Sequence, residues 1–312
     1  MLDIKTFLTD IKTMDPIIRE NAFDSEDFLY QVKWDGVRII AAISGETVYL
    51  RNKRGNHRTE QYPELQSLAG LLGVKNAVLD GEIVVLRKGK PSFPGVMQRD
   101  RSSTAMSIKH ASKTLPISYM VFDLLFLNGR DLRQQSLMER IFKMTELFDN
   151  QEYLHQVESF SEGTTLFEAV RSAGIEGIVA KRKTSLYSPG KNHSDWYKIK
   201  CLQTQNCLVG GYTLRANQVN ALLLGVVREG KLNFAGKAAN GLSSEHLKML
   251  SEELPALEVG TSPFDERSQR NHHYIEPRMA VLVEFLEWTE SLHLRFPVIK
   301  AFINVMDSDC SV

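Results

Sequence analysis

The sequence predicts an α+β protein of two domains, the first built of antiparallel sheets with flanking helices and the second a small β-barrel. Its 312 residues are too many for one small core and suit two domains. Strand-like apolar segments end in tight-turn sequences, which is typical of antiparallel hairpins. Beyond residue 203 a new series of short strands begins. We therefore expect domains at residues 1–203 and 204–312.

Local signals define the elements of the first domain. Ser44-Gly45-Glu46 separates two alternating segments, and Asn128-Gly129 ends another. Ser136-Leu137-Met138-Glu139 has the spacing of a helix capping box, and Gly174 stands where a second helix should end. We expect strands over 28–32, 37–43, 47–51, 77–87, 117–127, 177–181 and 196–200, and helices over 140–148 and 165–172.

The second domain has the pattern of a small barrel. Short strands and one helix over roughly 110 residues suit an OB-fold. The expected strands cover 207–212, 221–228, 232–234 and 279–288, and the expected helix covers 244–254.

Charge is balanced over the whole chain but not along it. Residues 1–202 contain 28 Lys and Arg against 25 Asp and Glu, whereas residues 203–312 contain 10 against 13. A net charge of zero argues weakly against a nucleic-acid partner, but several basic clusters in one half are suited to follow a phosphate backbone. A solvated loop is the commoner explanation for any one cluster. The clusters are Arg51, Lys53, Arg54 and Arg58; Arg87, Lys88 and Lys90; Arg99 and Arg101; and Lys181, Arg182 and Lys183.

Three features indicate the compartment. No apolar run reaches the length of a membrane span. Charged residues within the first ten positions argue against a secretory signal. The three cysteines are odd in number and lack zinc spacing, which indicates a reducing environment. We expect a cytoplasmic protein that does not associate with a membrane.

Lys33-Trp34-Asp35-Gly36 is the first segment that suggests chemistry. A lysine becomes a nucleophile once it loses its proton. Gly36 permits a tight turn that lets backbone approach a ligand. For so short a motif, a surface Lys–Asp pair at a turn is the commoner explanation.

Two glutamates and two lysines complete a possible set. Glu82 and Glu176 each adjoin a glycine at a strand, and carboxylates there accept hydrogen bonds from a ribose or help to hold Mg²⁺. Lys198 and Lys200 share one face of a strand, where a triphosphate is a suitable anion and solvent is the alternative. With Lys33 these residues suit a metal-bound nucleotide, because phosphoryl transfer needs mainly positioning and charge neutralisation.

These motifs, in this order, resemble those of the covalent nucleotidyltransferases, which comprise DNA ligases, RNA ligases and mRNA capping enzymes. The matches are Lys33–Gly36 to the KxDG motif with Arg38 as its trailing arginine, Leu79–Val84 to the DGE motif, Tyr119–Leu125 to the segment whose aromatic residue stacks on adenine, here Phe122, and Glu176-Gly177 and Lys198–Lys200 to the next two motifs.

The finer resemblance is to ATP-dependent bacterial DNA ligases of the end-joining type. Gly236–Ser243, Glu284–Thr289 and Leu294–Pro297 are similar to their GKVGTGFS, EWT and LRHP segments. The resemblance implies an adenylation (nucleotidyltransferase) domain at 1–203 and an OB-fold domain at 204–312.

An activity in DNA repair and recombination follows from this resemblance. It implies that Lys33 attacks ATP and holds AMP covalently, that nicked double-stranded DNA is the substrate, and that the protein is a monomer at the bacterial nucleoid with end-joining proteins such as Ku as partners. The implied catalytic residues are Lys33, Asp35, Lys198 and Lys200; the implied nucleotide contacts are Gln31, Lys33, Arg38, Lys53, Arg54, Glu82, Phe122, Glu176, Lys198 and Lys200; and Glu82 and Glu176 are the implied ligands of Mg²⁺ or Mn²⁺.

Three positions depart from the family pattern. Gln31 replaces a glutamate that contacts the adenine amino group, and its amide oxygen still accepts that hydrogen bond. Lys53 replaces an arginine and loses its bidentate fork, so we expect the adjacent Arg54 to substitute. Ile303–Asp307 stands where the family has RxDK, which orients pyrophosphate, and contains neither the arginine nor the lysine. We predict slow self-adenylation, or another basic residue in its place.

Two alternatives stay open. One is an RNA ligase or a capping-type nucleotidyltransferase. The other is a degenerate ligase homologue that binds DNA ends without catalysis, which the altered C-terminal motif and the zero net charge favour.

Overall fold

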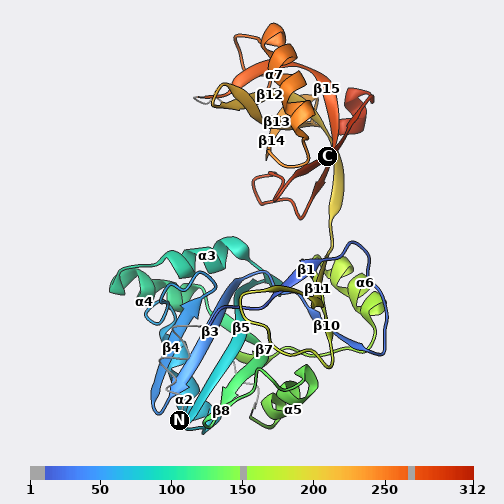
Figure 1. The fold of residues 1–312 in the computed structure, drawn as a ribbon. Helices are drawn as coiled ribbons and strands as arrows, with labels where there is room; N and C mark the ends of the chain where they lie inside the picture. Colours follow the sequence, from blue (N-terminus) through green and yellow to red (C-terminus); the bar gives the residue numbers. More distant parts are fainter. Residues whose placement is uncertain (1–10, 148–152, 266–270) are drawn as a thin grey trace. The chain divides into compact units, whose positions relative to one another are not determined.

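The computed structural model describes residues 11–147, 153–265 and 271–312 and divides into two compact units, Met1–Cys201 and Leu202–Val312 (Figure 1). We call them the N-terminal and the C-terminal unit. The first ten residues, which bear on the absence of a secretory signal, lie outside the described residues. No helix in the described ranges has the length and apolar character that a membrane crossing requires.

The N-terminal unit contains two sheets and several helices. Its elements are β1 (Asp15–Ile18), β2 (Phe28–Val32), β3 (Val37–Ser44), β4 (Thr47–Asn52), η1 (Pro63–Ser67), α2 (Leu68–Leu72), β5 (Asn76–Arg87), β6 (Lys90–Pro91), α3 (Phe93–Arg101), α4 (Ala105–Thr114), β7 (Ile117–Leu127), β8 (Arg130–Asp131), α5 (Leu137–Leu147), β9 (Leu154–Gln156), α6 (Gly163–Ala173), β10 (Gly177–Arg182) and β11 (Asn192–Lys200).

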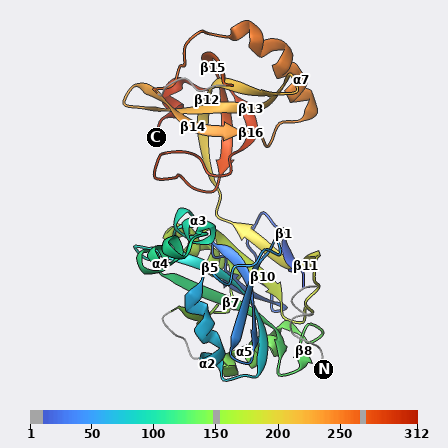
Figure 2. The same cartoon turned by 90° about the vertical axis from the view of Figure 1, so that its left-hand side faces the viewer.

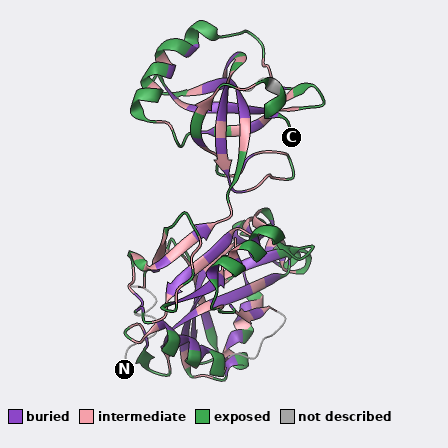
Figure 3. Ribbon diagram, turned by 90° about the vertical axis from the view of Figure 1, so that its right-hand side faces the viewer, coloured by how far each residue is buried: buried purple, intermediate pink, exposed green. Residues whose placement is uncertain are grey.

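The larger sheet of this unit has the order β4-β3-β5-β7-β8, with β6 paired to β5 and β9 to β7. The β3–β4 hairpin turns at Gly45, whose φ of 58° suits glycine. β3 buries the five consecutive residues Ile39–Ile43, so both faces of this strand are covered. Helices α3 and α5 pack against β5 and β7, and Figure 3 shows burial concentrated along the strands.

The smaller sheet has the order β1-β11-β10-β2, in which β1 runs parallel to β11 and the other pairs are antiparallel. Helix α6 covers β2 and β10 and ends at Gly174 in the left-handed conformation, as the sequence predicted. The segment after β2 continues into β3 of the larger sheet. The two sheets therefore meet at the residues that follow β2.

The C-terminal unit is a five-stranded antiparallel sheet of order β14-β13-β12-β15-β16, with α7 packed on β13 (Figure 2). Several register shifts interrupt its ladders, and such bulges bend strands. Its elements are β12 (Gln203–Arg215), β13 (Gln218–Arg228), β14 (Lys231–Ala238), α7 (Ser244–Glu253), η2 (Leu254–Leu257), β15 (His273–Phe285), β16 (Val298–Ile303) and η3 (Asp307–Cys310).

Most expected elements are present, with shifted ends. The strand expected over 279–288 is β15, which begins and ends earlier because it pairs along β12 from Tyr212 to Gln203. The helix expected to end at Phe148 is α5, and Phe148 lies outside the described residues. Strands β1, β9 and β16 and helices α2, α3 and α4 were not expected.

Arg99 and Arg101, one of the basic clusters for which a phosphate contact or a solvated loop was expected, lie in α3. The Arg99 side chain is fully buried and donates to the Glu64 carboxylate at 2.7 Å. Asp100 is buried and accepts from Arg58 Nε at 2.8 Å. The loop interpretation is wrong, because this pair of charges attaches α3 to the chain that follows β4.

Candidate functional site

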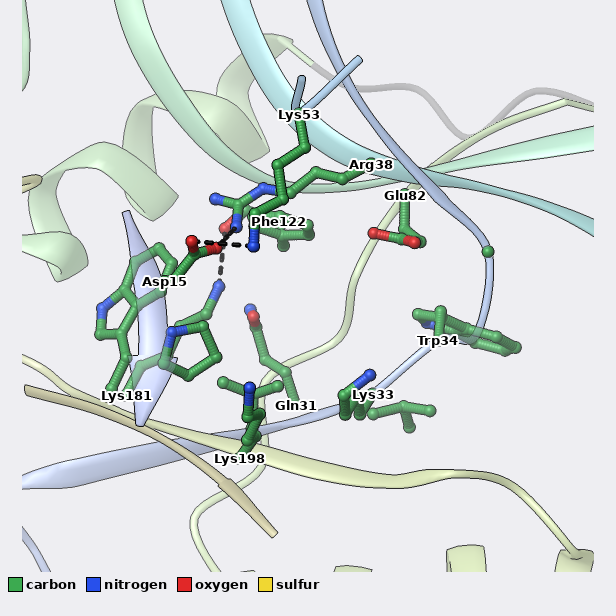
Figure 4. A pocket seen from close by; sticks show the side chains of 15 residues that line it. Asp15, Gln31, Lys33, Trp34, Arg38, Lys53, Glu82, Phe122, Lys181 and Lys198 are labelled. Atoms are coloured by element: carbon green, nitrogen blue, oxygen red, sulfur yellow. Dashed lines mark hydrogen bonds and ion pairs between the residues drawn. The ribbon is translucent and has the colours of Figure 1, made fainter. Parts of the chain in front are cut away.

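A pocket of about 320 Å³ lies in the N-terminal unit, where the two sheets face each other (Figure 4). Strands of both sheets supply its walls, together with the segment that joins β2 to β3. Its lining residues are Asp15, Pro16, Gln31, Val32, Lys33, Trp34, Gly36, Arg38, Lys53, Glu82, Phe122, Val179, Lys181, Trp196 and Lys198.

Lys33 is fixed by its backbone and by its side chain. It directly follows β2, and its N–H donates to the Gly177 carbonyl oxygen at 2.9 Å. Its Nζ forms an ion pair with Glu176, whose other carboxylate oxygen lies 2.9 Å from Lys200 Nζ. Burial acts to raise the pKa of Glu176, but Lys33 and Lys200 outweigh burial and lower it. The amine therefore stands at the pocket wall, held by a charged carboxylate.

The motif glycines allow strands to approach each other. A Cβ on Gly36 would lie 2.1 Å from the Ile83 carbonyl oxygen, and one on Gly177 would lie 2.1 Å from that of Ile199. Gly36 has no left-handed φ, so close contact with β5, rather than a tight turn, requires glycine here.

Arg38 lies at the centre of a buried polar network. Its Nε and Nη2 donate to the two Asp80 carboxylate oxygens at 2.9 and 2.6 Å, and Tyr187 donates to the same group at 2.7 Å. Asp15 pairs with Arg38 at 3.1 Å and with Lys53 at 2.8 Å, as the dashed lines in Figure 4 show. Burial acts to lower the pKa of Arg38, but Asp80, Tyr187 and Asp15 together outweigh burial, so the pKa is raised.

Gln31 occupies the opposite wall and is only 2% exposed. Its Nε2 donates to Ser159 Oγ at 3.1 Å. Its Oε1 is buried and has no hydrogen-bond partner among the described residues. Figure 4 shows the amide directed into the pocket. A buried acceptor without a partner is costly, so this atom is suited to accept a hydrogen bond from a ligand.

Lys181 lines the pocket between the aromatic rings of Phe122 and Trp196. Its Nζ is 4.3 Å from the ring centroids of both Phe122 and Trp196 and donates to the Phe122 carbonyl oxygen at 3.3 Å. Burial lowers the pKa of Lys181 to about 7. Because this side chain is buried, it does not belong to a basic cluster on the surface. The same holds for Arg99, and both clusters are corrected accordingly.

Glu82 and Lys198 are the remaining charged residues that line the pocket. Burial raises the pKa of Glu82 to about 8, and within the described ranges its carboxylate makes no hydrogen bond or ion pair. Burial, followed by the nearby Lys200 and Lys33, lowers the pKa of Lys198. The described residues contain no group of three or more metal-ligating side chains. One or two carboxylates nonetheless suit Mg²⁺, which keeps water and phosphate oxygens as its other ligands.

The pocket brings together most of the residues expected from sequence. Glu176 and Lys200 connect to it through Lys33, whereas Asp35 and the exposed Arg54 lie outside its lining. Lys53 is among the lining residues, so the structure has Lys53 at the pocket where the adjacent Arg54 was expected to substitute for it. Several participants were not expected at the site. Trp34 and Asp80 stand inside the motifs Lys33–Gly36 and Leu79–Val84, Lys181 was expected only in a basic cluster, and Trp196 only as the start of a strand. Nothing local marks the others, which are Asp15, Ser159 and Tyr187.

In the C-terminal unit the three expected segments adjoin one another. The Leu294 N–H donates to the Ala235 carbonyl oxygen at 2.7 Å, and the Ile299 N–H donates to that of Asn240 at 3.0 Å. The Leu286 N–H donates to the Arg295 carbonyl oxygen at 3.0 Å. These bonds place the segments 236–243, 284–289 and 294–297 side by side.

Residues 303–312 pack against the same sheet. Ile303 and Val305 contact an apolar cluster that includes Leu208 and the fully buried Cys310. The Val312 N–H donates to the Val227 carbonyl oxygen at 3.2 Å. The segment that lacks the expected basic residues therefore contributes apolar contacts to the barrel.

Comparisons with known proteins match both units. Residues 11–200 match a family model described as the ATP dependent DNA ligase domain, and residues 215–303 match the ATP dependent DNA ligase C terminal region. The multifunctional non-homologous end joining DNA repair protein LigD of Mycobacterium tuberculosis is 34% identical over 87% of this chain and 35% of its own length. The chain thus spans about a third of that relative.

Two further comparisons cover most of their counterparts. DNA ligase C1 of Mycolicibacterium smegmatis is 29% identical over 73% of this chain and 68% of its own length. A solved structure of a mycobacterial DNA ligase D, complexed with ATP and MES, is 30% identical, with a TM-score of 0.57, and covers 97% of this chain and 98% of its own. These matches confirm the predicted fold class, an α+β adenylation domain of antiparallel sheets followed by an OB-fold β-barrel.

Proposed function

Since the chain belongs to the ATP-dependent DNA ligase family, we propose that it seals nicks and breaks in DNA through a covalent AMP on Lys33. The observation that supports this most directly is the pairing, in one pocket, of a strand-end lysine with an unpartnered buried acceptor, Gln31 Oε1. The first is the nucleophile that nucleotidyl transfer needs, and the second fits the amino group of adenine.

The pocket has groups for each part of ATP. Phe122 offers a ring on which adenine stacks, and Gln31 Oε1 accepts from the adenine amino group. Glu82, which lacks a hydrogen-bonding partner in the described structure, accepts from a ribose hydroxyl. Lys53 and Lys198 line the pocket and neutralise phosphate charge. Asp15 holds Lys53 until phosphate replaces it.

In the proposed first step, Lys33 Nζ gives up one proton to water while Glu176 still holds the amine in position. Its lone pair forms a bond to the α-phosphorus of ATP, and the bond from that phosphorus to the bridging oxygen breaks. Pyrophosphate departs with the electron pair, and Nζ loses its second proton, which leaves a phosphoramidate. Glu176 and Lys200 position the amine for this attack.

The later steps transfer the AMP. A 5′-phosphate oxygen at the nick attacks the phosphorus and releases Lys33. The 3′-hydroxyl then attacks the activated 5′-phosphate, and AMP leaves. We propose end joining in the bacterial cytoplasm as the setting and Mg²⁺ as the metal, with Glu82 as its ligand and Glu176 as a second one once Lys33 has moved. Ku as partner, a monomeric state and the role of Asp35 stay predictions.

The sequence of residues 303–306 bears on the rate at which Lys33 is adenylated. No basic side chain stands at Ile303, Asn304, Val305 or Met306, so pyrophosphate has no partner there. We expect slow adenylation of Lys33, followed by normal use of the AMP already loaded.

The test uses ATP labelled on its α-phosphate. The chain should incorporate AMP, and addition of a nicked duplex should convert that label into sealed strand. Lys33→Ala should abolish both reactions, by about a thousandfold or more, whereas Lys113→Ala on the exposed end of α4 should not change them. Sealing by Lys33→Ala, labelling by GTP alone, or sealing of nicked RNA in preference to DNA would contradict the proposal.

A further inference from the structure

The chain that follows β9 runs past both Phe122 and Gln31, the two residues proposed to contact the base. The Val157 N–H donates to the Val121 carbonyl oxygen at 2.8 Å, next to Phe122. Tyr30 and Phe160 exchange both backbone hydrogen bonds, at 2.9 and 2.8 Å, in an antiparallel bridge. In an antiparallel pair the next residue of one strand faces the preceding residue of the other. Ser159 therefore stands opposite Gln31.

The contact between these two side chains orients an amide. Gln31 Nε2 donates to Ser159 Oγ at 3.1 Å, and this leaves Oε1 as the end of the amide that has no partner among the described residues. An amide has an acceptor at one end and donors at the other. Whichever end faces the pocket decides whether the ligand must donate or accept. Since Gln31 is 2% exposed, solvent does not offer the amide a second partner.

Ser159 is exposed, which suits it to act as an acceptor. Its hydroxyl proton is free to point to water, and an oxygen lone pair then faces Gln31. The acceptor that holds the amide thus comes from a residue outside the pocket lining.

We propose that Ser159 determines the base selectivity of this site by holding the Gln31 amide with its oxygen toward the base, an inference that rests on the proposed function. Adenine presents an amino donor at position 6, which Oε1 accepts. Guanine presents a carbonyl oxygen there, which faces Oε1 without a hydrogen bond. A buried group left unpaired by the wrong ligand is an effective source of discrimination. Without Ser159 Oγ, the amide rotates and presents Nε2, which guanine accepts.

The experiment measures binding apart from chemistry. In the full chain with Lys33→Ala, which forms no covalent AMP, isothermal titration calorimetry gives Kd for ATP and for GTP. Ser159→Ala should lower the ratio of the GTP Kd to the ATP Kd about fivefold, the loss of one orienting hydrogen bond. Ser159→Asp, which only accepts, should keep the ratio at or above that of the parent. Ser161→Ala, an exposed neighbour, should leave it unchanged.

The outcomes separate the two proposals. An unchanged ratio in Ser159→Ala, or a reduced ratio in Ser159→Asp, would overturn the role of Ser159 while labelling of Lys33 in the parent still supports ligase chemistry. Binding that follows the expected ratios without any AMP labelling in the parent would support Ser159 and overturn the covalent mechanism. Absence of binding by either nucleotide would overturn both.

Discussion

The two units differ in what they bury. The described residues include nine buried polar or charged side chains outside the aromatic and cysteine groups, and all of them belong to the N-terminal unit: Thr13, Gln31, Asp80, Arg99, Asp100, Asp123, Arg140, Lys181 and Ser185. The main core of the C-terminal unit is apolar over its described ranges, with Leu222, Leu224 and Val281 at its centre.

This difference reflects the work of each unit. Burying a charge costs free energy unless a partner compensates it, and several buried charges of the N-terminal unit have such a partner. Asp80 holds Arg38 at the pocket, and Asp123 holds Arg140 behind it. The barrel has no comparable network in its described part, and its last residues add apolar contacts where relatives are expected to place an arginine and a lysine.

The largest effect should come from breaking the charged core. Arg140 and Asp123 are both fully buried and share two hydrogen bonds, at 2.7 and 2.9 Å. Arg140→Met leaves Asp123 buried without its cation, which should lower the free energy of unfolding by about 4 kcal/mol. Urea denaturation followed by tryptophan fluorescence, with Trp288→Phe to silence the C-terminal unit, measures this.

The control for this prediction removes both charges. The double variant Arg140→Met with Asp123→Asn should be more stable than Arg140→Met alone, because no unpaired charge remains. If the single variant proves as stable as the parent, the pair does not hold α5 on β7.

A smaller loss should follow from a cavity in the apolar core of the barrel. Leu222 is fully buried on β13, and Leu222→Ala should cost about 3 kcal/mol from lost burial and the cavity left behind. The change should appear in the transition reported by Trp288 when Trp34 and Trp196 are replaced by Phe. Leu214→Ala, at a side chain 41% exposed, is the control. Equal effects at the two positions would mean that the barrel core is not tightly packed.

A charge at the pocket should matter to chemistry more than to stability. Glu176→Gln removes the partner of Lys33 and Lys200, so the amine loses its position and AMP incorporation should fall about a hundredfold. Both lysines are partly exposed and regain water, so the urea midpoint should move little. Glu168→Gln on the exposed face of α6 should change neither. If Glu176→Gln instead lowered the urea midpoint strongly and incorporated AMP normally, Glu176 would serve stability and not the chemistry.

Elements and site residues that depend on neighbours along the chain were predictable from the sequence. Motifs such as Lys33–Gly36 combine a strand end with reactive side chains, so both the element and its chemistry were predictable. Helix α6 was predictable because Gly174 supplies a local end signal. In each case neighbours along the chain contain the information.

Residues that act across the fold escaped prediction. Asp15 meets Arg38 and Lys53 only because β1 pairs with β11. Ser159 meets Gln31 only through the bridge at Tyr30. Helix α3 was missed because its buried charges, which read as a polar surface segment, are compensated by residues about 35–42 positions earlier in the chain. Long-range pairing of this kind has no local signal.

The smallest effect concerns Lys181 and tests whether the N-terminal unit keeps a neutral amine in its core. Burial lowers the pKa of Lys181 to about 7 from an ordinary value of 10.5. Between these values the unfolded chain binds more protons than the folded one, so the free energy of unfolding rises with pH. Relative to Lys181→Met, the parent should gain about 2 kcal/mol between pH 7 and 9, measured by urea denaturation.

Lys113→Met, at an exposed lysine of α4, is the matched control for the loss of one lysine. Glu82 titrates in both proteins, with a pKa of about 8 raised by burial, and its contribution falls with pH instead; the difference between parent and Lys181→Met removes it. A difference that stays constant from pH 7 to 9 would mean that Lys181 is charged throughout. The rings of Phe122 and Trp196, each 4.3 Å from Lys181 Nζ, would then stabilise a buried ammonium group. The N-terminal unit would in that case bury one more charge than a neutral Lys181 implies.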